Sequence, residues 1–341
     1  MERREARSQS RLTAAGSMKV CVVGAGAIGG MIAAHFARAG FETGVVARGP
    51  HLQAMRERGL TLTGPAETFS VKVSTHEDPA AFGVQNIVVI GLKAHQIPAM
   101  LPRLGGMVAP ETVVVPAING LPWWYFFREG GPQDGASIDC LDPAGEMFAA
   151  LDPHRVIGCV VHAAAHVSAP GEIRTNGNRV FYLGEPDRSL SRRLNALADA
   201  FRRAGLEPQV SDDIRTDAWT KLIGNLPFNP IAAFTRANLT QLCDNPALVA
   251  WIRLLMEEAN AVALAYGVKP RLSIDKRLEL ARSVGPVKSS MLQDLELNRP
   301  MEIEPIVGAA VELARKAGVA TPNIDLLYAM INELARNSAR P

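Results

Sequence analysis

The chain has 341 residues, of which 48% are hydrophobic, and its formal net charge at pH 7 is +2. Its length and apolar content are sufficient for about two packed domains, and the near-neutral charge argues against a nucleic-acid or anionic-membrane partner. The four cysteines form no CxxC pair, a pattern typical of reduced thiols in a cytoplasmic protein and not of a disulfide framework or a metal site. The longest apolar stretches are too short and interrupted to span a bilayer.

The first segment of the chain differs in composition from the rest. Residues 1–17 are polar, rich in arginine and without periodicity. Glu2 and Glu5 argue against a transit peptide. We therefore expect a disordered tail, or a start site assigned too far upstream, and a fold that begins near Met18.

A glycine turn between a predicted strand and a predicted helix follows. The apolar run at 20–23 indicates a buried strand, and residues 31–40 indicate an amphipathic helix that ends at a glycine. The GxGxxG turn between them predicts a dinucleotide-binding site rather than an unrelated glycine-rich turn. Gly24 permits the tight turn, Gly26 lets the backbone approach a pyrophosphate, and Gly29 lets the helix pack on the strand. The residues expected to meet the cofactor at the helix N-terminus are Gly24, Gly26, Ala27, Ile28 and Gly29.

The second predicted strand, over residues 42–48, bears on which nucleotide is bound. An NAD site carries an Asp or Glu near the end of this strand, where it binds the ribose 2′-hydroxyl. Here the strand ends at Arg48, followed by Gly49 and Pro50. A guanidinium binds a 2′-phosphate, which a carboxylate would repel. The sequence therefore favours NADPH, with a solvated surface arginine as the alternative.

Two further buried strands are predicted over 86–91 and 112–118, which extends the alternation of strands and helices typical of a parallel sheet. Lys93 and Asn119 follow these two strands. Ligands of such sheets bind at the carboxyl ends of the strands. Both side chains are therefore candidates for cofactor or substrate contacts, with an ordinary loop lysine and a turn asparagine as the alternatives.

The segments 155–162 and 179–184 are predicted as strands of an antiparallel extension to the sheet. His162 and His166 lie here with a spacing of four residues. The strand-like context and the lack of a third ligand argue against a metal site, so none is predicted.

From about residue 212 the pattern becomes helical. Helices are predicted after Asp212 and Asp213, and over 245–266, 273–283, 290–298, 301–317 and 323–337. The expected fold is α/β: an N-terminal Rossmann-type, NADP-binding domain over residues 18–210, followed by an all-helical catalytic domain over residues 211–338.

The first helix of the second half carries a polar series. A spacing of four places Lys221 and Asn225 on one helix face. Asn229 extends this line only if the helix continues, which Pro227 and Pro230 make unexpected, because each lacks an N–H and clashes with the preceding turn. The apolar neighbours indicate burial, and buried amide and ammonium groups need partners that a ligand can supply. A surface lysine followed by a capping asparagine is the alternative.

Two later residues have a structural and a functional interpretation. Ser290 and Gln293 have the spacing of a capping box, with Ser290 as the cap. Pro300 is expected in the first turn of the next helix, where Glu302 would interact favourably with the helix dipole. From their spacing alone, capping is the stronger interpretation for both Ser290 and Glu302.

The chain resembles the ketopantoate reductase family (2-dehydropantoate 2-reductase) over nearly all of its length after residue 17. The motifs that carry the resemblance are GAGAIGG at 24–30, GLKAHQ at 91–96, NG at 119–120, WTKLIGNLPFNP at 219–230, SSMLQD at 289–294 and MEIE at 301–304. Each motif alone is unspecific, but their order and spacing together are specific.

The resemblance implies NADPH-dependent reduction of ketopantoate to pantoate, a step towards pantothenate and coenzyme A, with no metal. It implies that Lys221 is the general acid and that Glu302 interacts with it. The implied binding residues are Asn225, Asn229 and Ser290 for the substrate, Lys93 for the nicotinamide end of the cofactor, and Asn119 for both. The implied partners are a small 2-oxo acid and, in some family members, a second copy of the chain.

Five consecutive aromatic residues from Trp123 to Phe127 depart from the family pattern. They are interpreted either as a domain-interface plug or dimer contact or as an altered pocket that accepts a bulkier or more apolar 2-oxo acid. Two alternatives to ketopantoate reduction therefore stay open. One is reduction of another 2-oxo acid, and the other is a non-catalytic NADPH-binding protein.

Overall fold

The structure, a computed structural model, describes residues 18–338, so the prediction for residues 1–17 lies outside the described residues. The chain forms two compact units. The α/β unit contains the chain up to Ile118 together with Phe126–Ala136 and Gly145–Ile214, and the helical unit contains Asn119–Tyr125, Ser137–Ala144 and the chain from Arg215 onward. Two short segments of the first half of the chain are thus part of the helical unit.

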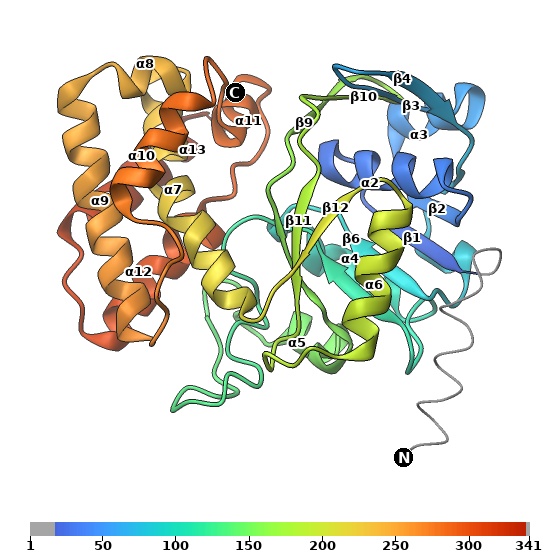
Figure 1. Cartoon of the computed structure of the whole chain (residues 1–341), viewed down its shortest axis with the longest axis horizontal. Coiled ribbons are helices and arrows are strands. Elements are labelled where there is room, and N and C mark those ends of the chain that lie inside the picture. Colours follow the sequence, from blue (N-terminus) through green and yellow to red (C-terminus); the bar gives the residue numbers. More distant parts are fainter. Residues whose placement is uncertain (1–17, 339–341) are drawn as a thin grey trace. The chain divides into compact units, whose positions relative to one another are not determined.

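A five-stranded parallel sheet forms the centre of the α/β unit, with strand order β5-β2-β1-β6-β7 (Figure 1). The strands are β1 (Lys19–Val23), β2 (Glu42–Val46), β5 (Ser74–His76), β6 (Ile87–Ile90) and β7 (Val113–Pro116). Valine and isoleucine dominate β1, β6 and β7, and nearly all of these side chains are buried, as expected for strands covered on both faces. The four strands predicted in this region are confirmed.

Two smaller sheets complete the α/β unit. One has the order β4-β3-β10-β9 and the other β12-β11-β8. Their strands are β3 (Leu60–Thr63), β4 (Thr68–Val71), β8 (Gly158–Val161), β9 (Ala165–Ala169), β10 (Glu172–Thr175), β11 (Val180–Gly184) and β12 (Glu207–Val210). The two predicted strands are present and β8 pairs with β11 antiparallel, as expected, but they belong to a separate three-stranded sheet and do not extend the parallel one.

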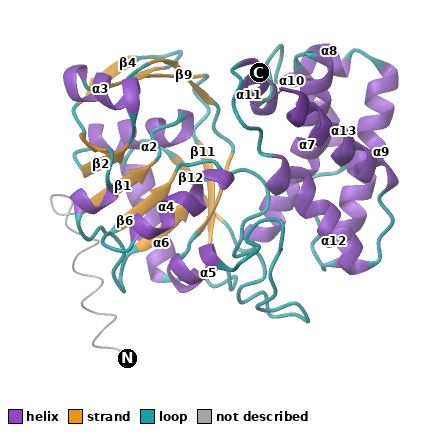
Figure 2. Ribbon diagram, turned by 180° about the vertical axis from the view of Figure 1, so that it is seen from behind, coloured by secondary structure: helices purple, strands orange, loops and turns teal. Residues whose placement is uncertain are grey.

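Helices cover these sheets in the α/β unit (Figure 2). They are α2 (Ala27–Arg38), α3 (Gly49–Arg58), α4 (Ile97–Leu104), α5 (Glu146–Ala150) and α6 (Arg192–Arg203), with short helical turns η1 (Pro79–Phe82), η2 (Ala94–Gln96) and η3 (Pro153–Arg155). Met31, Ile32 and Phe36 of α2 are fully buried and belong to the same core as Val20 and Val22 of β1. This packing holds the glycine turn between β1 and α2.

The helical unit consists of α7 (Ile214–Thr235), α8 (Leu239–Cys243), α9 (Pro246–Ala265), α10 (Ile274–Ser283), α11 (Ser290–Glu296), η4 (Glu304–Gly308), α12 (Ala309–Ala317) and α13 (Pro322–Ser338) (Figure 1). All predicted helices are present, and α8 is an addition. The segment η4 is a π-helix, a form that occurs often at functional sites. Among residues 18–338, no helix is both long and apolar enough to cross a membrane.

The helix α7 runs through Pro227 and Pro230 without a break, so the expected interruption is wrong. Each interior proline costs a helix about 3 kcal/mol. Leu226, Phe228 and Ile231 are all at most 5% exposed, and their burial contributes about 1.5–3 kcal/mol each. The packing of this segment therefore offsets the free-energy cost of both prolines.

Two predicted helix starts are displaced in the structure. Ser289, not Ser290, caps α11, since its Oγ accepts a hydrogen bond from the N–H of Leu292 at 3.2 Å. The capping box with Ser290 as the cap is therefore wrong, and Ser290 is the first helical residue. The next helix starts at Ile303, so Pro300 and Glu302 precede it and do not form its first turn.

Candidate active site

The glycine turn after β1 has the tight geometry that its sequence predicts. Gly24 has a φ of +101°, and a Cβ atom there would lie 2.8 Å from the side chain of Leu92. A Cβ atom at Gly29 would lie 2.0 Å from the carbonyl oxygen of Gly24. The fold itself therefore requires glycine at both positions: a side chain at Gly29 would separate α2 from the turn, and one at Gly24 would push the turn away from Gly91 and Leu92.

Gly26 differs from these two glycines. A Cβ atom there would lie 3.8 Å from its nearest neighbour in the protein, so packing within the chain does not require glycine. Gly26 is exposed and is the N-cap of α2, which has no side-chain hydrogen bond at its cap. The main-chain N–H groups of Ala27 and Ile28 are thus open to an anion at the positive end of the helix dipole. This arrangement fits a pyrophosphate.

Arg48 and Lys93 lie at the same edge of the sheet as the glycine turn. The strands β2, β1 and β6 are adjacent and parallel, so the segments that follow their carboxyl ends share that edge. Arg48 is exposed and is the N-cap of α3, and its guanidinium has no hydrogen bond or ion pair with the residues that the structure describes. Lys93 is half-buried at the N-cap of η2. The guanidinium of Arg48 is available for a phosphate.

In the helical unit, Asn119 connects Lys221 with Glu302. The Lys221 Nζ donates to the Asn119 Oδ1 at 2.8 Å, and the Asn119 Nδ2 donates to the Glu302 Oε2 at 3.2 Å. This orientation of the amide gives the ammonium an acceptor and the carboxylate a donor at the same time. Glu302 is buried, and Lys221 and Asn119 are half-buried. The three predicted side chains therefore form one hydrogen-bonded array.

The turn after Asn119 fixes this array. Gly120 has a φ of +78°, and a Cβ atom there would lie 2.0 Å from the carbonyl oxygen of Pro305. The same oxygen accepts a hydrogen bond from the N–H of Leu121 at 2.8 Å. Pro305 belongs to η4, which begins two residues after Glu302. The turn and the π-helix thus pack against each other and bring Asn119 to Glu302.

The unbroken helix α7 extends the polar line from Lys221 to Asn225 and Asn229, which follow at intervals of four residues. Asn225 is half-buried and has no hydrogen bond from its side chain to the described residues. Asn229 is buried, and its Nδ2 has no hydrogen-bond partner among them. An unsatisfied buried amide costs about 1–3 kcal/mol. Both amides are therefore open to a ligand.

Ser290 is exposed at the start of α11, and its hydroxyl has no hydrogen bond to the residues that the structure describes. Because Ser289 makes the cap, the hydroxyl of Ser290 remains available for a substrate. The described contacts do not join Ser290 to Lys221, Asn119 or Glu302.

The first four residues of the aromatic run are buried in the protein, and Phe127 is half-buried. Trp123 and Trp124 are at most 4% exposed, and both indole N–H groups are buried with no hydrogen-bond partner among the described residues. The Tyr125 hydroxyl accepts a hydrogen bond from the Trp219 indole of α7 at 2.6 Å, and the Tyr125 carbonyl accepts one from Arg215. Tyr125 therefore has a packing role beside the helix that carries Lys221.

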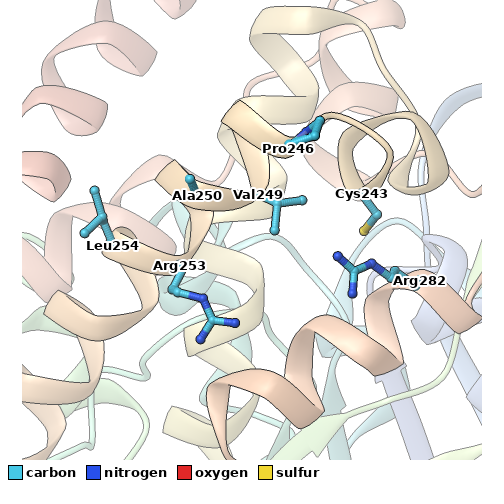
Figure 3. A pocket seen from close by; sticks show the side chains of 7 residues that line it. All are labelled: Cys243, Pro246, Val249, Ala250, Arg253, Leu254 and Arg282. Atoms are coloured by element: carbon cyan, nitrogen blue, oxygen red, sulfur yellow. The ribbon is translucent and has the colours of Figure 1, made fainter.

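Two further features lie apart from the predicted site residues. Among residues 18–338, no group of three or more His, Cys, Asp or Glu side chains could hold a metal ion. A groove of about 570 Å³ in the helical unit is lined mainly by α9, together with Cys243 of α8 and Arg282 of α10 (Figure 3). None of the predicted site residues lines this groove.

The sequence reasoning missed one charged residue beside the array. Arg277 of α10 donates a hydrogen bond from its Nη2 to the main-chain oxygen of Lys221 at 3.0 Å. Since 56 residues separate the two in the chain, no local pattern indicates the contact. The feature of the sequence that could have indicated this contact is Gly224, because a glycine among large side chains in the middle of a helix leaves space for another group.

An α/β unit with a dinucleotide-type turn, accompanied by a helical unit that carries a lysine in a polar array, is the design of a nicotinamide-dependent oxidoreductase. Family profiles agree with this class. The profile described as "Ketopantoate reductase PanE/ApbA" matches residues 20–188, and "Ketopantoate reductase PanE/ApbA C terminal" matches residues 213–335.

Individual relatives give the same result. The chain is 42% identical over 319 residues to the 2-dehydropantoate 2-reductase of Mesorhizobium japonicum, which covers 93% of this chain and 98% of that protein. A provisionally assigned ketopantoate reductase from Ralstonia solanacearum MolK2 is 36% identical with a TM-score of 0.89, covering 95% and 99% of the two chains. The 2-dehydropantoate 2-reductase structure from Geobacter metallireducens has 25% identity and a TM-score of 0.82, covering 93% and 99%. The chain belongs to the ketopantoate reductase family.

Proposed function

We propose that the protein reduces 2-dehydropantoate (ketopantoate) to pantoate with NADPH, a reaction that contributes to pantothenate and coenzyme A synthesis. The observation that carries this proposal is the hydrogen-bonded array of Lys221, Asn119 and Glu302 in a member of this family. A silent dinucleotide-binding protein has no need of a partly buried ammonium ordered in this way.

Lys221 is the general acid of the proposed reaction. A bound reduced nicotinamide supplies a hydride to the ketone carbon, and negative charge then develops on the ketone oxygen. The ammonium of Lys221 stabilises this charge and donates the proton that completes the alcohol. Asn119 orients the ammonium through its Oδ1, and Glu302 holds the amide of Asn119 in the required orientation.

The amides on α7 and the hydroxyl of Ser290 bind the substrate in this proposal. Asn229 supports the assignment because its Nδ2 is buried without a partner in the described chain. Asn225 lies one turn nearer to Lys221 on the same face. Hydrogen-bond donors of this kind suit the hydroxyl and carboxylate oxygens of a small hydroxylated 2-oxo acid.

NADPH is the proposed cofactor. The turn formed by Gly24, Gly26 and Gly29 would hold the pyrophosphate, with Lys93 nearer to the nicotinamide. Arg48 would hold the 2′-phosphate, since its guanidinium is exposed and makes no ion pair with the described residues. A homodimer remains a prediction that sedimentation analysis of the purified protein would test.

A spectrophotometric assay tests the proposed reaction. We expect NADPH oxidation at 340 nm with ketopantoate to exceed that with pyruvate, 2-oxoisovalerate and an aromatic 2-oxo acid. Binding of NADPH without turnover of any of these acids would contradict the proposal and favour a non-catalytic protein.

A second candidate substrate class has one observation in its favour. The large side chains of Trp123 and Trp124 are buried four and five residues after Asn119 in the chain, and large aromatic side chains complement apolar ligands. Preference for the aromatic or branched acid over ketopantoate would support this class. It would leave the assignment of Lys221 unchanged, and Trp123 and Trp124 would be the first residues to substitute.

A further inference from the structure

Arg277 lies directly on the helix that carries Lys221. The Arg277 Nη2 donates to the main-chain oxygen of Lys221 at 3.0 Å. Arg277 is part of α10, and both helices belong to the helical unit. The guanidinium is therefore held beside the turn of α7 that begins at Lys221.

Gly224 makes room for this guanidinium. A Cβ atom at Gly224 would lie 2.2 Å from the Nε, 2.4 Å from the Nη2 and 2.6 Å from the Cζ of Arg277. Gly224 has an ordinary helical backbone, so its φ angle does not require glycine. Glycine costs a helix interior about 1 kcal/mol relative to alanine. In return, Gly224 permits close contact between α7 and the guanidinium of Arg277.

The charge of Arg277 is not balanced within the described chain. Its one described hydrogen bond is to a carbonyl oxygen, and it forms no ion pair with a carboxylate among residues 18–338. The nearby Arg271 differs, because it pairs with the buried carboxylate of Asp217 at 2.6 Å. Burial lowers the pKa of Arg277 from its ordinary value, which indicates that desolvation opposes its charge. Arg277 is half-buried; an unpaired cation withdrawn from water in this way is costly, and an anion from outside would reduce that cost.

The position of the guanidinium matches the chemistry of a 2-oxo acid. Residues 221 and 224 are neighbours on the helix surface, because three residues separate them. The guanidinium, which lies at the Cβ position of Gly224 and bonds the Lys221 oxygen, is thus beside the part of α7 from which Lys221 projects. In a 2-oxo acid the carboxylate is bonded to the ketone carbon, so the cations that recognise these two groups must be neighbours.

We propose that Arg277 binds the carboxylate of the 2-oxo acid whose ketone oxygen receives the proton of Lys221. This inference rests on the proposed function and names the group that selects acids over neutral ketones. The planar guanidinium binds a carboxylate through two parallel hydrogen bonds. Gly224 is a positioning residue, since it acts by allowing Arg277 to approach the helix.

The test compares two substrates that differ in charge. Ketopantoate carries a free carboxylate and a free hydroxyl, and in its neutral lactone these two groups are joined as an ester beside the same ketone; the wild type and the control variants measure the effect of the ring closure itself. We expect Arg277→Gln to raise the KM for ketopantoate roughly 10- to 100-fold, which corresponds to the loss of a charged hydrogen bond. The kcat should stay within about threefold of the wild-type value, because the carboxylate is bound equally in the ground state and the transition state. The kcat/KM for the lactone and the Kd for NADPH should stay unchanged.

Two further variants sharpen the test. Gly224→Ala keeps the charge but displaces the guanidinium, so the KM for ketopantoate should rise while turnover of the lactone is retained. Arg282→Gln is the matched control, because it removes an exposed arginine from the same helix, and both substrates should behave as with the wild type.

The outcomes separate the two proposals. If the wild type reduces no 2-oxo acid, the proposed function fails and the role of Arg277 fails with it. If the wild type reduces ketopantoate but Arg277→Gln lowers kcat/KM for the acid and the lactone by the same factor, Arg277 has a structural role only. A KM for ketopantoate that is unchanged in Arg277→Gln also overturns the inference.

Discussion

Gly120→Ala tests whether the turn after Asn119 positions the catalytic array. The variant introduces a Cβ atom 2.0 Å from the Pro305 oxygen, whereas ordinary contacts begin near 3.4 Å. The turn and η4 must therefore separate by about 1.4 Å to restore an ordinary contact. This shift breaks the hydrogen bond from the Leu121 N–H to the Pro305 oxygen and moves Asn119 away from Lys221.

The expected magnitude has two parts. The positive φ of Gly120 costs an alanine about 1–2 kcal/mol, and the lost hydrogen bond adds about 1 kcal/mol, so the free energy of unfolding should fall by roughly 2–3 kcal/mol. Misplacement of catalytic groups by about 1 Å can lower the rate about 100-fold. We therefore expect a similar loss in kcat/KM for NADPH-dependent reduction of ketopantoate.

Gly318→Ala is the matched control. Gly318 also has a positive φ, of +66°, and belongs to the same unit, but no atom lies within 4 Å of its Cβ position. This variant should show the cost of the backbone conformation alone and keep its activity. Chemical denaturation and initial rates of both variants give the comparison. Equal losses of stability, together with wild-type kcat/KM in Gly120→Ala, would refute the reasoning.

Three further variants have defined expectations. Lys221→Ala should lower kcat at least about 100-fold, the usual contribution of a general acid, and a rate near that of the wild type would remove Lys221 from this role. Arg48→Ala should raise the Kd for NADPH far more than that for NADH, and equal weakening of both would contradict the contact with the 2′-phosphate. Burial and the carboxylate of Glu304 raise the pKa of Tyr328 to about 12. In the unfolded chain a tyrosine hydroxyl loses its proton near pH 10, so above this pH the hydroxyl of Tyr328 stays protonated only in the folded state. Stability should therefore fall as the pH rises above about 10, and Tyr328→Phe should reduce this fall in urea titrations; identical profiles for both proteins would argue against the assignment.

Much of the α/β unit could be predicted because its signals are local. The valine-rich runs of β1, β6 and β7 and the glycine turn before α2 each occupy a few consecutive residues. The strands β3, β4, β9 and β10 were not predicted, since they are short and half-exposed and acquire their strand character from pairing with one another. Continuity of α7 could not be predicted either, because it depends on the burial of apolar side chains around its prolines.

The contacts within the candidate site are not local. Asn119 meets Lys221 across 102 residues and Glu302 across 183 residues, so spacing rules cannot place these side chains together. Their places after a strand or on a helix face made Asn119 and Lys221 candidates, and the family motifs assigned their roles, whereas Arg277 belongs to no such motif and was missed. Ser290 shows that the start of a helix cannot be predicted to a single residue. A shift of the cap by one residue decides whether the hydroxyl of Ser290 makes the capping hydrogen bond.

The Asn119–Gly120 pair also determines how the protein ages in storage. With no side chain on the glycine, its main-chain nitrogen is unhindered in attacking the asparagine amide, and the resulting succinimide opens to aspartate or isoaspartate. Aspartate at position 119 would place an oxygen where the amide now donates to Glu302, so two carboxylates would face each other. Slow loss of activity in a stored preparation should then coincide with a mass increase in the peptide that contains residue 119. The increase is about 1 Da, because an OH group replaces the NH₂ group of the amide, and with it the donor to Glu302 is lost.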